Sequence, residues 1–322
     1  MNRAGKNLVR WSFWGFAVWG SATAQAQLNW GQAADYTVLV GGGGTTFGMS
    51  SAGTVNGKVG IGQSGSSADN VNLSGGTING PLNWQGTYNF GGNGNNNPPN
   101  FGGTINPAWN SVNNQNVSAV GSALSTVTGL SSAFGGFYSS GNAISINTQS
   151  GGQTIDAKTA GTLEQNVTVS TVNYGSAYVV NVNSVTLNNN PLTITDSGTT
   201  KAVVINVDDQ NGEFNNGIVL GAGLTANQVI INIISNGEFQ NAANGAAQHV
   251  SYIYDQASGG FNVESPIDGN VYVGGGGGVS FKVLAPVTGV GVPESGTWVT
   301  GLFLLFPLGG YLLKRVRKPV IQ

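Results

Sequence analysis

Few side chains in this sequence are of the kinds that carry out catalysis. His249 is the only histidine, and the chain has no cysteine. A histidine-based triad needs a nucleophile and an orienting carboxylate, and a catalytic zinc ion needs three protein ligands. No serine elbow or carboxylate motif surrounds His249, so we expect it to lie at the end of a strand. The missing cysteines exclude disulfides, zinc–thiolate sites and thiol catalysis.

Acidic side chains gather in the segment Asp208-Asp-Gln-Asn-Gly-Glu213. Alignment of an EF-hand loop on Gly212 would need an oxygen ligand at Val207 and a carboxylate at Ile218, and both are missing. We therefore expect a turn, with a calcium site of another type left open. Carboxylate pairs can also hydrolyse glycosides, but the sequence selects no pair. We expect no catalytic residue, no metal site and no cofactor, and thus a protein that is not an enzyme.

Most basic residues lie at the two ends of the chain. Seven of the eleven lysines and arginines precede the first apolar run or follow the last one. Residues 27–292 hold four lysines, no arginine and twelve acids, so their net charge is 4 − 12 = −8, against −2 for the whole chain. Binding to a phosphate backbone needs clustered lysine and arginine, so nucleic acid is excluded as a partner.

The N-terminus has the three parts of a secretory signal peptide. A basic stretch ends at Arg10, an apolar run of about ten residues follows, and Ala22-Thr-Ala24 and Ala24-Gln-Ala26 have the form of cleavage sites. The sequence predicts a signal peptide over 1–26, an uncleaved anchor being the alternative. The protein is then exported, with the export machinery as its first partner.

The C-terminus combines a short motif, an apolar run and a basic end. The motif is Val292, Pro293, Glu294, Ser295 and Gly296, within a linker over 287–297. A transmembrane helix and basic tail are expected over 298–318, with the basic end in the cytoplasm. This tail resembles PEP-CTERM sorting signals, most nearly the VPDSG variant. The resemblance implies cutting by an exosortase-like sorting protease and passage from the inner membrane to the outer envelope or beyond. A plain membrane anchor is the alternative.

The middle of the chain alternates short β-branched runs with glycine and asparagine turns. Gly-Thr-(Val/Ile)-Asn occurs three times, beginning at Gly53, Gly76 and Gly103, at spacings typical of solenoid repeats. One helix is expected over about 107–131, because six apolar residues from Val112 to Leu130 form one stripe. Strands return from Ala143, among them 165–172 and 177–182. The sequence predicts a mainly β chain over 27–286, an elongated β-solenoid with one long helix packed along it, and a β-sandwich is the alternative.

Two apolar strands in this middle region each carry one asparagine. Asn206 lies in Ala202-Val-Val-Ile-Asn-Val207, and Asn232 lies in Gln228-Val-Ile-Ile-Asn232. Because these strands are apolar on both faces, we expect them to be central and buried. The two amides could stack as a ladder, or they could be unrelated.

The same strands, with Gln32–Val40, Val55–Ile61 and Leu284-Ala-Pro286, resemble the choice-of-anchor A domain of bacterial surface proteins. The order of strands and helix also resembles the ice-binding β-solenoid family. These resemblances imply a β-solenoid on the cell surface.

The expected function is that of an exported, non-enzymatic protein of the cell surface or extracellular matrix, structural or adhesive, with extracellular polysaccharide among its expected partners. Ice binding is the first alternative. It needs regularly spaced threonines, and Thr45-Thr46, Thr193-Ile-Thr195 and Thr199-Thr200 give no sustained ladder. A carbohydrate-active enzyme or glycan-binding module is the second alternative.

Overall fold

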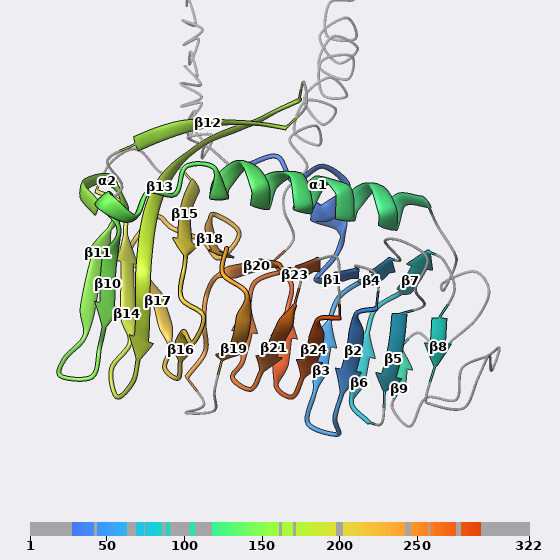
Figure 1. Ribbon diagram of the computed structural model, residues 1–322. Coiled ribbons are helices and arrows are strands. Elements are labelled where there is room, and N and C mark those ends of the chain that lie inside the picture. Colours follow the sequence, from blue (N-terminus) through green and yellow to red (C-terminus); the bar gives the residue numbers. More distant parts are fainter. Residues whose placement is uncertain are drawn as a thin grey trace, which may run out of the picture.

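The computed structural model describes residues 28–290, apart from 42–43, 63–68, 74, 86–87, 91–103, 107–117, 161–162, 170–171, 198–201, 242–245, 257 and 275–277. Its strands are mainly parallel and stack as a β-solenoid, which confirms the mainly β architecture predicted from the sequence (Figure 1). The expected signal peptide (1–26), sorting motif (292–296) and membrane segment (298–318) lie outside the described residues. Among the helices that the structure describes, none is long and apolar enough to cross a membrane.

The strands form three faces, which meet at tight turns. The helix face consists of β7 (Leu82–Gln85), β4 (Val59–Gly62), β1 (Val38–Gly41), β23 (Val271–Gly274), β20 (Ser251–Asp255), β18 (Val229–Ile233), β15 (Ala202–Val207) and residues 177–182 of β13 (Val172–Leu187). The second face consists of β8 (Tyr88–Phe90), β5 (Asp69–Leu73), β2 (Thr46–Met49), β24 (Ser280–Val283), β21 (Gly259–Val263), β19 (Gly237–Asn241), β16 (Glu213–Phe214), residues 184–187 of β13, and β10 (Ile144–Asn147). The third face consists of β9 (Thr104–Asn106), β6 (Thr77–Asn79), β3 (Thr54–Asn56), β25 (Pro286–Thr288), β22 (Ile267–Asp268), β17 (Ile218–Leu220), β14 (Leu192–Thr195) and β11 (Gln153–Asp156), with Gln248 bridging β17 and β22.

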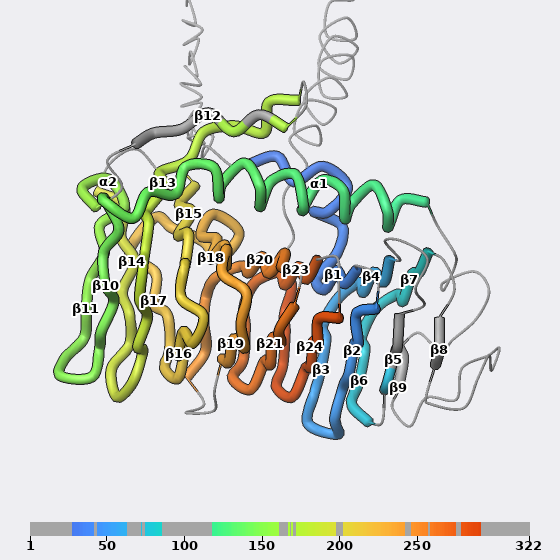
Figure 2. The backbone as a smooth tube through the Cα atoms, viewed as in Figure 1, coloured from blue at the N-terminus to red at the C-terminus, as the bar shows by residue number. Residues whose placement is uncertain are grey.

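The order of the turns along the solenoid differs from their order in the chain. Strands β1–β9 build one end, and β10 then starts at the other end. From there the chain winds back until β23, β24 and β25 pair with β1, β2 and β3. Figure 2 shows this seam as blue N-terminal strands beside red C-terminal ones. The first and last turns of the chain are therefore neighbours in the body of the solenoid.

The long helix α1 (Ser118–Gly135) lies along the helix face (Figure 1). Val120, Leu124, Val127 and Leu130 of the expected stripe are buried, and they pack with residues of the helix face. The structure describes the helix only from Ser118, and the helix ends at Gly135 rather than near 131. The poor intrinsic helix propensity of its Ser, Thr and Gly residues is offset by this burial.

Some expectations for the other elements were wrong. The short 3-10 helix η1 (Gly31–Asp35), which the sequence patterns did not predict, precedes β1. The expected separate strands 165–172 and 177–182 are β12 (Leu163–Val169) and the 16-residue β13, which pair antiparallel beside α1. A change of register at Val167 and a positive φ at Gly175 let this pair bend over the helix. The sequence patterns did not predict η2 (Ser140–Asn142) or α2 (Ala157–Ala160) either.

Aromatic side chains stack in register inside the solenoid. Phe239, Phe261, Phe281 and Phe47 occupy equivalent positions on β19, β21, β24 and β2. Their ring centroids lie 5.3, 5.8 and 5.5 Å apart in that order. These separations are within the ~4.5–7 Å range of favourable aromatic pairs. The stack crosses the seam between β24 and β2 and stabilises it.

Asparagines form a buried ladder beneath the helix, which we call the inner ladder: Asn181, Asn206 and Asn232. The Nδ2 of Asn232 donates to the Oδ1 of Asn206 at 2.9 Å, and the Nδ2 of Asn206 donates to the Oδ1 of Asn181 at 3.2 Å. This confirms the expected stacking of Asn206 and Asn232. The same amides also donate to carbonyls at the C-terminal end of α1 and just beyond it, those of Ser131, Phe134 and Phe137. The inner ladder therefore joins α1 to the helix face, and one of its bonds goes to the carbonyl of Phe134, among the last four of the helix, which have no partner within it.

Candidate functional site

The third face carries a second, exposed ladder, built from the Gly-Thr-(Val/Ile)-Asn repeat. We call it the outer ladder: Thr54 and Asn56 of β3, Thr77 and Asn79 of β6, and Thr288 of β25. Thr54 pairs with Thr77, and Asn56 with Asn79, while Val55 and Ile78 between them are buried in the core. β9 continues the same register, with Thr104 beside Thr77 and Asn106 beside Asn79. Threonine and asparagine thus form two parallel rows, repeating at about 4.8 Å, the strand spacing.

Hydrogen bonds fix the asparagine row. The Nδ2 of Asn79 donates to the Oδ1 of Asn56 at 2.8 Å, and the Nδ2 of Asn56 donates to the Oγ1 of Thr288 at 3.2 Å. Threonine, being β-branched, has few rotamers on a strand. The exposed amide of Asn56 keeps a further N–H and a further lone pair for solvent. The outer ladder therefore offers polar groups at regular positions, with little side-chain freedom to lose on binding.

Glycines at the corner next to the outer ladder allow the turns to stack closely. Gly57 has φ +142°, and a Cβ there would clash with the side chain of Thr37. A Cβ at Gly80 would clash with the main-chain oxygen of Gly57. Glycine after Asn56 and after Asn79 is thus required by packing.

His249 and Asp268 continue the row toward the other end of the third face. Asp268 pairs with Thr288 in register, and its Oδ2 lies 3.0 Å from the Nδ1 of His249, with both side chains about half exposed. His249 lies just outside a strand, next to the bridging residue Gln248, close to the strand end that was predicted. No group of three histidine, aspartate or glutamate side chains in the described ranges is arranged to hold a metal ion.

The acidic segment 208–213 forms the turn that the sequence predicted, between β15 and β16. The carboxylate of Asp209 accepts hydrogen bonds from the main-chain N–H groups of Val185 and Asn211, at 2.8 and 3.0 Å. Its role in the fold is therefore to hold a corner of the solenoid. Elsewhere, at the far end of the third face, hydrogen bonds from Ser197 hold the pKa of the exposed Asp156 below its ordinary value.

The threonine pairs singled out in the sequence are not the ones that form the regular array. Thr45 is buried, and 199–200 lie outside the described residues. Thr193 and Thr195 lie on β14 beside Thr154 and Asp156 of β11, but the next strand presents Val219. The Thr-x-Asn array was missed because the motif was interpreted only as a solenoid repeat. The signal was the valine or isoleucine at its centre, which turns both flanking residues outward.

Among the residues that the structure describes, the second face carries no comparable array. The residues in register along its middle are Glu213, Gln240, Asn262, Lys282, Gly48 and Asn72. Their size and charge change from one strand to the next. The second face therefore suits a discrete contact rather than a repeating one.

No protein-family model matches the chain, and no curated protein matches it. Solved structures that resemble it include an ice-binding protein from an Antarctic biological consortium, with 12% identity, 83% of this chain and 92% of that chain covered, and a TM-score of 0.48. An ice-binding protein from an Antarctic Flavobacteriaceae bacterium has 15% identity, 86% and 52% coverage, and a TM-score of 0.47. A glycosylated ice-binding protein from an Arctic yeast has 14% identity, 84% and 97% coverage, and a TM-score of 0.42. All three are named as ice-binding proteins, the kind of protein that the sequence analysis gave as its first alternative.

Proposed function

We propose that this protein binds ice through the outer ladder on its third face. The observation that carries the proposal is the in-register pairing of Thr54 with Thr77 and of Asn56 with Asn79, on a sheet that β9 extends by one more strand. The surface of an ice crystal presents water molecules at repeating positions. Polar groups held at repeating positions can anchor ordered water at small entropic cost. Side chains that change from strand to strand, as on the second face, cannot do so.

The expected effect of a bulky residue in the outer ladder is a loss of ice binding without a loss of fold. Thr77→Tyr introduces a residue that is also favourable in strands. Its ring projects beyond the threonine and asparagine rows and so prevents them from contacting a flat crystal surface. We expect the purified protein to lose most of its thermal hysteresis. Ice shaping under a microscope gives a second measurement.

Thr193→Tyr is the matched control, because Thr193 faces outward on β14 of the same face but beside Val219 rather than in the outer ladder. It should leave thermal hysteresis unchanged, and both variants should keep the melting temperature of the wild type. A wild-type protein that neither shapes ice nor depresses its growth would refute the proposal.

We also propose that the protein acts outside the cytoplasm. The signal-peptide pattern over 1–26, the sorting motif from Val292 to Gly296 and the basic cluster after Leu313 support export followed by sorting at the inner membrane. Cell fractionation with mass measurement of the mature chain tests this. A protein that stays in the inner membrane with its C-terminal peptide attached would contradict the sorting step.

A further inference from the structure

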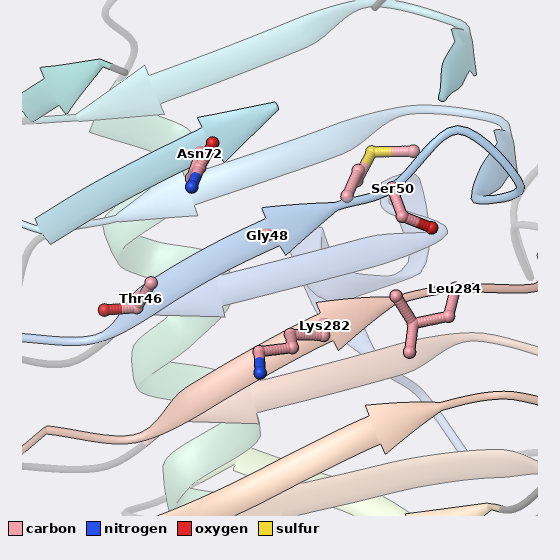
Figure 3. A pocket seen from close by; sticks show the side chains of 7 residues that line it. Thr46, Gly48, Ser50, Asn72, Lys282 and Leu284 are labelled. Atoms are coloured by element: carbon pink, nitrogen blue, oxygen red, sulfur yellow. The ribbon is translucent and has the colours of Figure 1, made fainter. Parts of the chain in front are cut away.

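A hollow of about 170 Å³ lies on the second face, where β24, β2 and β5 run side by side (Figure 3). Gly48, which has no side chain, lies at its centre. The residues that line the hollow around it include Thr46, Ser50, Asn72, Lys282 and Leu284. Drug-sized pockets measure ~300–1,000 Å³, so this hollow is large enough only for one small unit. It is open to solvent, so such a unit can belong to a longer chain.

Gly48 is not required by the backbone. It is not among the glycines with positive φ, and a Cβ there would meet its nearest neighbours, the Cγ of Lys282 and the main-chain oxygen of Asn72, at 3.5 and 3.8 Å. These are ordinary van der Waals contacts, unlike the clash at Gly57. Glycine in the interior of a strand also weakens it. The fold thus has space for a side chain at position 48, and the hollow is open there because the residue is glycine.

Lys282 supplies a positive charge at the edge of the hollow. The ion pairs seen within the described ranges join Lys58 to Asp35 and His249 to Asp268, and neither involves Lys282. The acids on the strands of the second face are Asp69, at the start of β5, Glu213 on β16 and Glu238 on β19, and Glu264 follows β21. Glu238 is two strand spacings from β24, ~10 Å away, which is about one Debye length at physiological salt. Lys282 is therefore available to an anionic group at its own position.

The remaining groups suit a sugar ring. Thr46 and Ser50 provide hydroxyls, Asn72 provides an amide, and Leu284 provides an apolar surface for the C–H face of a pyranose. Few polar groups around an apolar floor are typical of small-molecule sites. We infer that this hollow binds a carboxylate-bearing sugar unit of an extracellular polysaccharide, with the carboxylate at the Nζ of Lys282 and the ring over Gly48. The inference stands apart from ice binding, because it uses another face of the solenoid.

Binding is tested by calorimetric titration of the full-length protein with a tetramer of galacturonic acid, and with cellotetraose as the neutral probe. We expect measurable binding of the acidic tetramer only. Lys282→Gln should weaken it about ten-fold, the size expected for the loss of one charge-assisted hydrogen bond. Gly48→Thr fills the hollow with a residue that is favourable in strands and should abolish binding.

Two matched controls separate the site from general effects. Lys158→Gln removes a lysine on α2, at the other end of the solenoid, and Gly151→Ala adds a methyl group where no atom lies within 4 Å. Both should bind the acidic tetramer as the wild type does. Equal binding of cellotetraose, no binding by the wild type, or unchanged binding by Lys282→Gln would each overturn the inference. Thermal hysteresis of Gly48→Thr should equal that of the wild type, so failure of one proposal is distinguishable from failure of the other.

Discussion

At the scale of single residues, burial changes the ionisation of Asp255, at the end of β20. Burial beside α1 raises the pKa of its carboxyl, and the hydroxyl of Thr128, which donates to Oδ1 at 3.4 Å, offsets this only in part. A folded-state pKa above the unfolded value means that the folded protein holds this proton more tightly. The bound proton therefore stabilises the folded protein fully at a pH below the unfolded pKa of ~3.9. This stabilisation is lost as the pH rises through the raised folded pKa.

Asp255→Asn should therefore stabilise the protein at neutral pH, because the amide is uncharged and can still accept from Thr128. We expect the melting temperature at pH 7 to rise by ~2 °C, and the advantage to vanish at about pH 3. Scanning calorimetry of both proteins across this range provides the measurement. Glu238→Gln, a change at an exposed acid on β19, serves as the control. An equal gain for Asp255→Asn at both ends of the range would show that charge burial is not its cause.

At the scale of elements, the protein uses the same amide stacking for two purposes. The inner ladder is buried and holds α1 on the helix face, whereas the outer ladder is exposed. Removing an amide from the inner ladder takes hydrogen bonds from groups that lie away from water, while at the outer ladder solvent replaces the lost bond. The same substitution should thus have very different effects in the two places.

Asn206→Ala should destabilise the protein by about 3 kcal/mol, because it leaves Phe134 O, Asn181 Oδ1 and Asn232 Nδ2 without this partner. Asn79→Ala should cost less than ~1 kcal/mol. Denaturant unfolding measures both, and hydrogen exchange should show faster opening of α1 in Asn206→Ala alone. Similar losses of stability in the two variants would mean that burial does not distinguish the ladders.

Local sequence patterns predicted many of the elements but not their partners. The strands 202–207 and 228–232 were identified from their apolar runs, and α1 from its stripe, because each depends on residues close in the chain. The outer ladder depends on contacts such as that between Asn56 and Thr288, which are far apart in sequence. The hollow at Gly48 depends likewise on Lys282 from β24. No local propensity encodes such pairings, so the candidate sites emerged only from the register of the strands.

At the scale of the whole molecule, the seam between β1–β3 and β23–β25 unites the two parts of the solenoid. Val287 is fully buried on β25, in register with Val55 of β3 and Ile267 of β22. Val287→Asp places a carboxylate in this core, and we expect a loss of more than about 3 kcal/mol. In hydrogen exchange, protection should fall on both sides of the seam, in β1–β9 as well as in β20–β25. A loss confined to β25 would show that the two parts are stable independently.

The seam also dictates when folding can be completed. A nascent chain releases β1–β9 first, but the turn on which these strands stack is not made until residue 288 has emerged. Contacts between such distant segments make folding slow, because a very long loop must close before they add stability. The solenoid therefore cannot reach its native state until β23–β25 have been made. A chain that must leave the cytoplasm unfolded would gain from this delay, since its last turn completes the fold only after the first has had time to cross the membrane.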